Sequence, residues 1–394
     1  MPTAQPHRGT LFAHLDFVLT GMVMTLLGPI LPVLSARWGL NDMQAGSLIF
    51  AQFTSSIVGM LSSGPLVERI GYRRTQMLGL VLMAVGVAAL TRANWTLGFA
   101  AVCVFGIAFG TNTPATNLFI AHTNPERRAS ALNLLNSSWG VGAMGCPLLL
   151  ALVQRWNHLP WLLYGLPVAL ILLALSMSRV VFAADVDRSA PVGVPSGATN
   201  PWNHRLLPLI AAVFFVYVGS ENSVGQWVAT YARRISPSSQ MLWALTPSFF
   251  WGALLVGRAL APLALRRFNE VRVATAGVGL AATGVTVLLL ARSMPPVVVG
   301  AALAGLGCAS VYPISISLLP RWFGNAASKL SGTIFSMGNF GAASLPWLVG
   351  AISTRFGSLR VGLLVPLVGA LFLVLFYAYQ ATRLRAEGGL QSVR

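Results

Sequence analysis

The sequence predicts an all-α membrane protein, with twelve transmembrane helices in two pseudo-symmetric six-helix bundles. Of the 394 residues, 55% are hydrophobic and only 9% are charged, whereas soluble chains carry roughly a quarter charged residues. Apolar runs of about 20 residues, long enough to cross a hydrocarbon core of ~30 Å, recur along the chain. Basic residues gather in short clusters between these runs, as they do where they set membrane topology. A water-soluble globular protein is thereby excluded.

Each apolar run defines one expected helix, bounded by polar or basic residues. The first is too long for the apolar core of a cleaved signal peptide, so we expect it to remain as a helix. Residues 184–204 are rich in Pro, Gly, Ser and Asp, which is typical of a linker. This linker separates an N-terminal bundle (1–183) from a C-terminal bundle (205–394). The expected helices are 9–36, 44–67, 73–92, 95–122, 129–153, 160–182, 205–233, 240–264, 272–292, 296–320, 329–354 and 360–382.

The distribution of basic residues predicts the orientation. If both termini lie on one side, that side carries 17 basic residues and the other 8, with Arg258 inside a span. Because basic loops stay in the cytoplasm, we expect cytoplasmic termini. Eleven or thirteen helices would break this alternation. The single lysine among 26 basic residues hints at a GC-rich genome, and we expect the protein in a bacterial inner membrane.

Glycines and prolines repeat between the two halves. Gly106 and Pro114 match Gly305 and Pro313 after a shift of 199 residues, and Gly142 matches Gly341 after the same shift. We also match the pair Gly59 and Gly64 with Gly252 and Gly257. Three matches predict parallel six-helix repeats, an arrangement that places a transporter's binding site at the repeat interface near the midplane.

Several other classes of function are disfavoured. The net charge of +17 lies in loops between spans, so it does not indicate a nucleic-acid partner. Cys103, Cys146 and Cys308 lie inside apolar spans and are expected to be packing residues. We expect no metal site, because no histidine has a second ligand at helical spacing. No phosphate-binding glycine loop is present, so ATP and other cofactors are not expected. No nucleophile–base pair indicates an enzyme.

The loop between the second and third spans carries a specific motif. Gly64 permits close helix approach, Gly71 a tight turn, and Glu68 an ion pair with arginine. Such a cluster can act as a cytoplasmic latch between the halves. Here the chain resembles the major facilitator superfamily, departing at Glu68, where aspartate is usual. A degraded copy begins at Gly257 and Arg258. The expected latch residues are Gly64, Glu68, Arg69, Gly71, Arg73, Arg74 and Arg258.

A narrower resemblance is to the fucose permease (fucose–galactose–glucose:proton symporter) family. It is carried by short matches at Leu31-Pro32, 40–46, 133–140 and 311–315. The resemblance implies a sugar as cargo and a cation as driver. The family's fucose permease uses an aspartate in its first helix and a glutamate in its fourth, and here Gly28 and Thr113 (or Asn112) stand in their places. Symport therefore does not carry over directly.

Only two acids lie inside spans, and a charge at the bilayer centre costs about 2.5–3.5 kcal/mol. Asp16 is either an acid paired with His14 or a cytoplasmic arginine, or a cation-coupling carboxylate. Glu221 shares a helix face with Tyr217, and we favour a coupling role over a protonated packing acid. Arg258 either neutralises an intramembrane acid or, as we favour, belongs to the latch copy.

A sugar site needs aromatic faces and hydrogen-bonding amides or hydroxyls. Asn133 and Asn136 lie on one face and match the resembled family's polar pair, so they are the preferred contacts. Any single amide could instead join helices, at about 0.6 kcal/mol on average. The other candidates are Gln52, Asn112, Asn117 and Trp139 in the first half, and Tyr217, Asn222, Gln226, Trp227, Tyr231, Trp251, Tyr312 and Asn339 in the second.

Together these features predict a secondary active transporter for a small polar solute, with a monosaccharide favoured. It would work as a monomer in the lipid bilayer by alternating access, coupled to H⁺ or Na⁺ through Glu221 or Asp16. A drug:proton antiporter of the same fold and an uncoupled sugar uniporter are the alternatives. The amide-rich helices favour a polar cargo over a lipophilic one.

Overall fold

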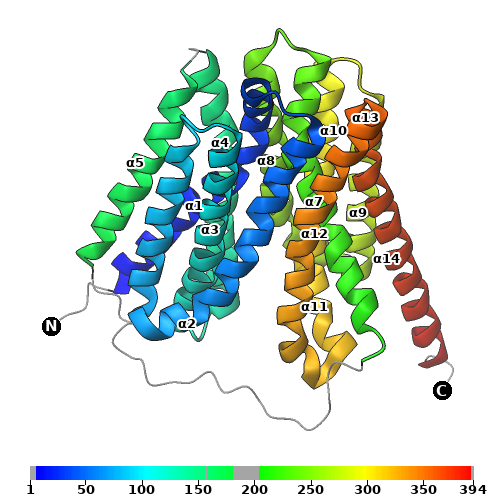
Figure 1. The fold of residues 1–394 in the computed structure, drawn as a ribbon. Helices are drawn as coiled ribbons and strands as arrows, with labels where there is room; N and C mark the ends of the chain where they lie inside the picture. Colours follow the sequence, from blue (N-terminus) through cyan, green and yellow to red (C-terminus); the bar gives the residue numbers. More distant parts are fainter. Residues whose placement is uncertain (1–5, 156–157, 181–203, 392–394) are drawn as a thin grey trace.

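The computed structural model describes residues 6–155, 158–180 and 204–391, and every element in these ranges is helical (Figure 1). The predicted linker lies outside the described residues, except for His204. The first half forms α1 (Pro6–Trp38), α2 (Asp42–Ala89), α3 (Trp95–Thr123), α4 (Arg128–Arg155) and α5 (Leu159–Ser178). The second half forms α7 (Leu207–Ile235), α8 (Gln240–Leu265), α9 (Glu270–Leu290), α10 (Met294–Cys308), α11 (Val311–Phe323), α12 (Ala327–Phe356), α13 (Leu359–Gly362) and α14 (Leu364–Gln391), with a 3₁₀ turn over Gly324–Ala326.

The helices reproduce the twelve predicted spans. Ten stretches of the described chain are long and apolar enough to cross a membrane, and one of them, Met294–Phe323, joins α10 and α11. The 48-residue α2 contains two predicted spans, 44–67 and 73–92. The 30-residue α12 falls outside the ten because its Gly, Ser, Thr and Asn residues dilute its apolar content, yet it coincides with the predicted span 329–354.

Gly71 divides α2 into its two spans. Its φ of 85° and ψ of 168° lie outside the helical region, in a part of conformational space that glycine reaches without the steric cost of a Cβ. The prediction that Gly71 permits a tight turn is therefore confirmed. Asn41, Asn94 and Asn269 are the N-cap residues of α2, α3 and α9. The side chain of each accepts a hydrogen bond from a backbone N–H in the first turn of its helix.

Matching glycines bring matching helices together in the two halves. A Cβ on Gly106 would collide with the backbone of α2, and one on Gly305 with the backbone of α8. Gly142 abuts the backbone of α1, and Gly341 abuts that of α7. In each pair the two helices hold the same places in their six-helix repeats. The repeat with a shift of 199 residues is thus confirmed, and small residues at helix crossings are its physical basis.

The third predicted match was assigned in the wrong register. A Cβ on Gly59 would meet the Ile107 carbonyl in α3. The position equivalent to Ile107 in the second half is Leu306, and Gly257, rather than Gly252, lies against it. Gly59 therefore corresponds to Gly257. Two glycines five residues apart occur in both places, so sequence alone allowed either pairing.

This correction moves Arg258 out of the latch copy. In the first half, the loop motif begins at Gly64, five residues after Gly59. Five residues after Gly257 is Pro262, so the degraded copy begins there, near the end of α8. Arg258 lies earlier, within α8, and its surroundings are described below.

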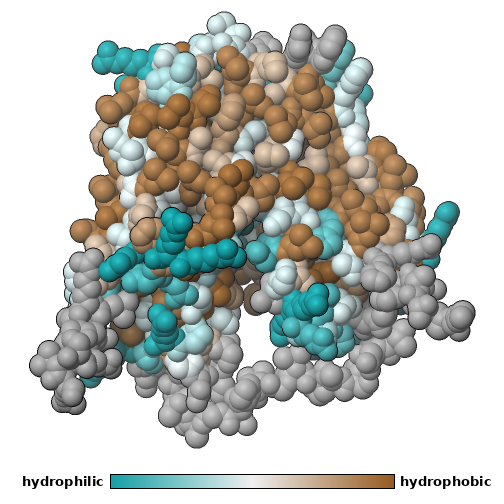
Figure 2. Space-filling view, turned by 180° about the vertical axis from the view of Figure 1, so that it is seen from behind, coloured by the Kyte–Doolittle hydropathy of each residue, from teal (hydrophilic) through white to brown (hydrophobic). Residues whose placement is uncertain are grey.

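The outer surface is that of a membrane protein. On the face in Figure 2, apolar residues form a broad band between more hydrophilic ends. Leu61, Leu375 and Leu172 lie inside membrane-spanning helices and are 74%, 71% and 59% exposed. Apolar side chains exposed at such positions face lipid. The chain is an integral membrane protein.

The two halves touch from the middle of the bundle to one end. We call the end where α1 passes to α2 and α7 to α8 the far end, and the end where α5 stops and α7 starts the linker end. Phe50 contacts Trp347 toward the far end, and Ser248 donates to the Met144 carbonyl at 2.9 Å. Toward the linker end the halves diverge (Figure 1), and the surface in Figure 2 shows a notch between them.

Candidate functional site

Asp16 is the centre of a buried polar cluster between α1 and α3. Its side chain is 0% exposed. Asn112 Nδ2 donates to Asp16 Oδ1 at 2.7 Å, Thr116 Oγ1 donates to Oδ2 at 2.8 Å, and Thr20 Oγ1 donates to Oδ1 at 3.3 Å. Residues four apart share a helix face. The pair Asp16 and Thr20 on α1 therefore faces the pair Asn112 and Thr116 on α3.

The Asp16 cluster contains neither of the charged partners considered for it. His14 Nδ1 lies instead 2.8 Å from Ser138 Oγ in α4, and no basic side chain among the described residues forms an ion pair with Asp16. Asn112 Oδ1 is buried without a hydrogen-bond partner. A buried carboxylate held only by neutral groups lacks a compensating charge. A proton or a small cation would supply it.

Glu221 belongs to a second cluster, in the other half. Its side chain is 8% exposed. Tyr217, one turn earlier in α7, donates its hydroxyl to Glu221 Oε2, which confirms that the two share a helix face. The same hydroxyl lies 2.8 Å from the carbonyl oxygen of Cys308 at the end of α10. The cluster therefore connects α7 with the break between α10 and α11.

Arg258 faces the Glu221 cluster from α8. Its guanidinium interacts electrostatically with Glu221, Tyr217 and Cys308. No ion pair within 4.0 Å links Arg258 to Glu221 in the described chain. The side chain is half-buried, and its Nε has no hydrogen-bond partner. Of the two roles considered for Arg258, this position favours a positive charge beside an intramembrane acid.

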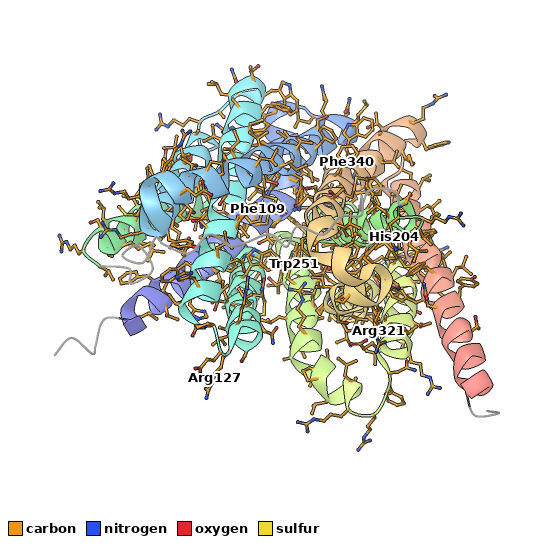
Figure 3. The ribbon with its side chains drawn as sticks, turned by 90° about the horizontal axis from the view of Figure 1, so that it is seen from below. Phe109, Arg127, His204, Trp251, Arg321 and Phe340 are labelled. Atoms are coloured by element: carbon orange, nitrogen blue, oxygen red, sulfur yellow. The ribbon has the colours of Figure 1, made fainter. Side chains whose placement is uncertain are left out.

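Helices α4 and α8 run antiparallel across the boundary between the halves. The Trp139 and Trp251 rings meet edge to face, with centroids 5.6 Å apart. Beside this pair, Gly140 lies against the Leu255 side chain. Seen from the linker end in Figure 3, Trp251 lies near the middle of the molecule. The contact between α4 and α8 therefore lies on the boundary between the halves, where alternating access would require movement.

Asn133 and Asn136 continue the same face of α4 toward the linker end. Both side chains are exposed, and Asn136 Nδ2 donates to the Leu132 carbonyl at 2.8 Å. Toward the linker end, the next turn of this α4 face holds Asn136, and the next turn of α8 beyond Leu255 holds Arg258 and Ala259. The contacts between the halves described above all lie on the far-end side of this level. The predicted amide pair therefore faces the space between the diverging halves.

Gln226 is an unsatisfied amide at the crossing of α1 and α7. It is 1% exposed, and neither Nε2 nor Oε1 has a hydrogen-bond partner. A Cβ on Gly28 in α1 would lie only 2.8 Å from Gln226 Oε1. Glycine at position 28, where the resembled family has an aspartate, thus makes room for Gln226. Because a buried unpaired amide is costly, Gln226 needs a solute hydroxyl or a water as partner.

Other predicted contacts are used for packing. Gln52 Nε2 donates to the Met24 carbonyl at 2.9 Å, and Trp227 Nε1 donates to the Pro346 carbonyl at 2.8 Å. Both side chains are 0% exposed. They join helices inside one half, as does Tyr231, whose hydroxyl donates to the Leu288 carbonyl at 2.7 Å. The structure does not bring these side chains to the space between the halves.

The remaining amides bond to their own helices. Asn117, Asn222 and Asn339 each donate to the carbonyl four residues earlier, at 2.9, 2.9 and 3.1 Å. Asn112 is engaged by Asp16 instead. Tyr312 stacks on Tyr217 with ring centroids 6.1 Å apart, which adds it to the Glu221 cluster. Four predicted residues, Asn112, Tyr217, Tyr312 and Arg258, thus gather around the two acids, and the others are dispersed.

The predicted latch loop contacts its own half. Arg73 donates to the carbonyls of Ser178 and Val180, at 3.3 and 2.8 Å, at the end of α5. A basic side chain is favourable at a helix C-terminus. Glu68, Arg69 and Arg74 are exposed, and the space around Gly64 is open. A latch between the halves stays a prediction for another conformation.

Sequence reasoning missed a network at the far end. Arg234 and Ser353 of the second half both donate to the Asp42 carboxylate of the first half. Next to it, the Met43 backbone N–H donates to Thr354 Oγ1 at 2.8 Å. We call these five residues the far-end network. Asp42 lies in the first turn of α2, where an acid is favourable in any helix, so its sequence position did not indicate a partner.

Comparisons with known proteins agree with this architecture. The family model of the Major Facilitator Superfamily matches residues 17–290. A glucose/galactose transporter of Brucella abortus is 26% identical over 374 residues, which cover 89% of each chain. The nucleoside transporter NupG superimposes with a TM-score of 0.78 at 10% identity, covering 94% of this chain and 99% of its own. The E. coli fucose:proton symporter FucP superimposes with a TM-score of 0.61 at 18% identity, covering 94% and 98%.

Proposed function

The chain belongs to the major facilitator superfamily, and on that premise we propose that it moves a monosaccharide across the membrane by alternating access, driven by H⁺ or Na⁺. Its relatives are transporters and not enzymes. We therefore assign the acids in its spans to binding of the coupling cation rather than to catalysis. The similarity to a glucose/galactose transporter over 89% of both chains supports a sugar as cargo.

The observation that carries the proposal is a set of polar groups where the halves separate. Asn133 and Asn136 continue the face of α4 that packs on α8, and α8 carries Arg258, whose charge acts on Glu221. Amides and a guanidinium offer the donors and acceptors that sugar hydroxyls require. The Trp139 ring, which is only partly buried where it packs on Trp251, is an aromatic surface for the C–H face of a sugar. A lipophilic drug would instead favour an apolar cavity.

The orientation follows from the charge distribution. With 17 of 26 basic residues on the linker-end side, that side faces the cytoplasm under the positive-inside rule. The halves are joined at the far end and apart at the linker end, so the structure corresponds to an inward-open state. We place the protein in a bacterial inner membrane, as a monomer with cytoplasmic termini.

Coupling is assigned to Glu221 or Asp16, since both are buried acids in spans. One positive charge that enters down a membrane potential of 100 mV releases about 2.3 kcal/mol. This free energy corresponds to roughly fifty-fold accumulation of the solute. Either acid could bind the cation, because each would otherwise be a charge in a low-dielectric site.

Uptake into proteoliposomes tests the proposal. Radiolabelled glucose, galactose and fucose are offered under a pH gradient or a Na⁺ gradient, with Glu221→Gln and Asp16→Asn run in parallel. Glu126→Gln, an exposed acid between α3 and α4, is the control. We expect one gradient to drive accumulation, and one of the two span variants to lose it while still exchanging sugar.

The other outcomes identify the alternatives. Sugar exchange without accumulation under either gradient would indicate a uniporter, in which both acids are structural. No sugar transport at all would contradict the sugar assignment. Binding of lipophilic cations that depends on pH would then indicate a drug:proton antiporter.

A further inference from the structure

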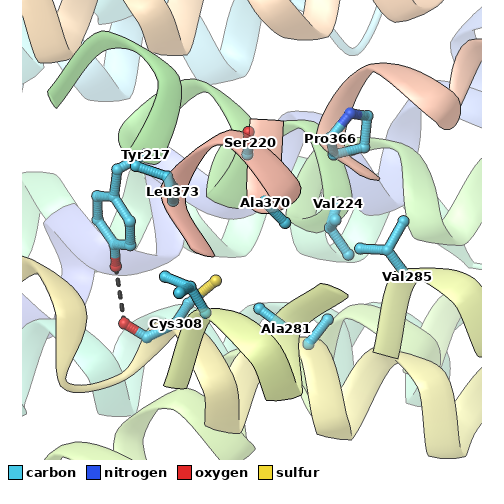
Figure 4. A pocket seen from close by; sticks show the side chains of 11 residues that line it. Tyr217, Ser220, Val224, Ala281, Val285, Cys308, Pro366, Ala370 and Leu373 are labelled. Carbon is cyan, nitrogen blue, oxygen red and sulfur yellow. Dashed lines mark hydrogen bonds between the residues drawn. The ribbon is translucent and has the colours of Figure 1, made fainter. Parts of the chain in front are cut away.

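The Tyr217 hydroxyl lies between two hydrogen-bond acceptors. One is Glu221 Oε2, and the other is the Cys308 carbonyl oxygen at 2.8 Å, drawn as a dashed line in Figure 4. A tyrosine hydroxyl has one hydrogen to donate, and its oxygen can accept another. While Glu221 is ionised, only one of the two acceptors receives that hydrogen. If Glu221 is protonated, it donates to Tyr217, Tyr217 donates to Cys308, and both bonds form at once.

The Cys308 carbonyl is available because the helix is interrupted there. In a continuous α-helix it would accept the N–H of Tyr312, four residues later. Here α10 ends at Cys308 and α11 begins at Val311. Pro313 has no N–H to donate to the Ala309 carbonyl, which favours a break at this point. A hydrogen bond from Tyr217 to Cys308 therefore acts directly on the junction between the two helices.

The charged and titratable groups that act on Glu221 come from α7 and from three helices packed near it. Tyr217 is on α7 itself, Arg258 comes from α8, Cys308 from α10 and Tyr312 from α11. Of these, Arg258 carries the positive charge that faces the carboxylate. Because it stays beyond ion-pair distance, it leaves the Tyr217 bond as the direct contact of Glu221.

A small cavity adjoins this junction. Tyr217 and Cys308 both line it, between α7, α9, α10 and α14, and its volume of about 20 Å³ is close to that of a single water site (Figure 4). The other lining residues are mostly Val, Ala and Leu, with Pro366 and Ser220. Because a close-packed interior resists rearrangement, this gap makes the end of α10 less tightly packed on the side that Tyr217 contacts.

We propose that Tyr217 is a positioning residue that transmits protonation of Glu221 to the break between α10 and α11, so that the coupling ion at this site is a proton. The proposal rests on the proposed function, since it assumes cation-driven transport. The proton adds to a carboxylate oxygen of Glu221 and forms its O–H bond, while Tyr217 stays neutral throughout. No other covalent bond is made or broken.

Sodium would not have this effect. Na⁺ bound to Glu221 has no hydrogen to donate, so the single hydrogen of Tyr217 would still be divided between two acceptors. Asp16 lacks the connection as well, because its partners lie on α1 and α3 within the first half. The argument for a proton therefore applies to Glu221 and does not extend to Asp16.

The test compares Tyr217→Phe with Tyr377→Phe in proteoliposomes. Tyr377 is also a buried tyrosine, and its hydroxyl lies 2.6 Å from Ser315 Oγ in α11, but it has no hydrogen bond to a carboxylate in the described part of the chain. We expect Tyr217→Phe to lower sugar accumulation driven by a pH gradient at least about tenfold, the effect of one charge-assisted hydrogen bond. Exchange at equal pH should stay within about threefold. Tyr377→Phe should accumulate sugar like the wild type.

Infrared difference spectra give a second readout that does not need transport. On acidification, the carbonyl band of protonated Glu221, identified by its absence in Glu221→Gln, should shift in Tyr217→Phe and stay in place in Tyr377→Phe. An unshifted band, wild-type accumulation by Tyr217→Phe, or accumulation driven by Na⁺ alone would overturn the inference. If the wild type transports no sugar under any gradient, the proposed function fails instead, and the infrared result still decides the role of Tyr217.

Discussion

Arg234 in α7 donates a hydrogen bond to Asp42 in α2 across a sequence separation of 192 residues. Ser353 in α12 donates to the other carboxylate oxygen of Asp42. One acid in the first half thereby binds two helices of the second half. Because these contacts lie at the end where the halves meet, the far-end network must break when that end opens.

Asp42→Asn should shift the protein toward the state that is open at the far end. The Asp42 side chain is 13% exposed and that of Arg234 is 45% exposed, so we expect the effect of a partly exposed pair, about 1 kcal/mol or roughly fivefold in population. Labelling of Ala45→Cys, at a buried position one turn below Asp42, with an impermeant maleimide measures this. Labelling should be faster in the Asp42→Asn background.

An exchange of charges provides the control for the far-end network. Asp42→Arg alone should label fastest, and Asp42→Arg combined with Arg234→Asp should recover part of the slow labelling. If the double variant labels as fast as the single one, the ion pair does not hold the far end closed.

Removal of Asn112 should destabilise the protein through Asp16. Asn112→Ala takes away the 2.7 Å hydrogen bond to a fully buried carboxyl, and we expect a loss of roughly 2 kcal/mol in the free energy of unfolding. Thr113→Ala is the matched control, because Thr113 Oγ1 is buried without a partner. Unfolding of the purified protein in detergent measures both. Equal losses would show that the Asp16 bond contributes nothing specific.

Asn133 and Asn136 should determine affinity rather than turnover. Each →Ala variant removes one hydrogen-bonding group from the space between the diverging halves, so the KM for sugar should rise roughly fivefold to thirtyfold, at about 1–2 kcal/mol per bond. Asn124→Ala, whose Nδ2 bonds to the Ile120 carbonyl at the end of α3, should leave KM unchanged. Initial rates of counterflow over a range of sugar concentrations provide the comparison. An unchanged KM in both variants would remove this amide pair from the site.

Substitution of the glycines at equivalent helix crossings in the two halves should destabilise the protein to a similar extent. Gly142→Ala would force a Cβ into the backbone of α1, and such overpacking costs typically about 1–3 kcal/mol. Gly341→Ala should cost a similar amount, since Gly341 makes the equivalent contact with α7. Gly145→Ala on the same helix meets nothing within 4 Å, so it should be neutral or slightly stabilising. The thermal unfolding midpoints of the three variants measure this. A loss in Gly142→Ala and Gly341→Ala but not in Gly145→Ala would show that steric crowding, rather than helix propensity, causes it.

The architecture was predictable from the sequence because its signals are local. A span needs about 20 apolar residues to cross the bilayer, and basic loops mark its ends. Gly71 indicated the turn that divides α2, and the matching glycines at 106 and 305 indicated equivalent helix crossings in the two halves. These features depend on the composition of a segment or on the size of one side chain, and both are readable without knowing the fold.

The candidate site was predictable only in part. The two span acids and the amide pair on α4 stood out by residue type and spacing. Their surroundings did not follow from spacing, since Asp16 is held by Asn112 and Thr116 rather than by its neighbour His14. A helical residue has neighbours three and four positions away, but the helix that it faces is set by how the bundle packs.

By itself, the sequence determined that this chain is a twelve-span membrane protein with two repeats and two acids in its spans. Only the tertiary structure decided that Arg258 faces Glu221 rather than the latch copy, and that Asp42 meets Arg234. The physical reason is the register between helices. A slip of one turn in α8 changes which side chains meet across the bundle, while the hydropathy of the segment stays the same.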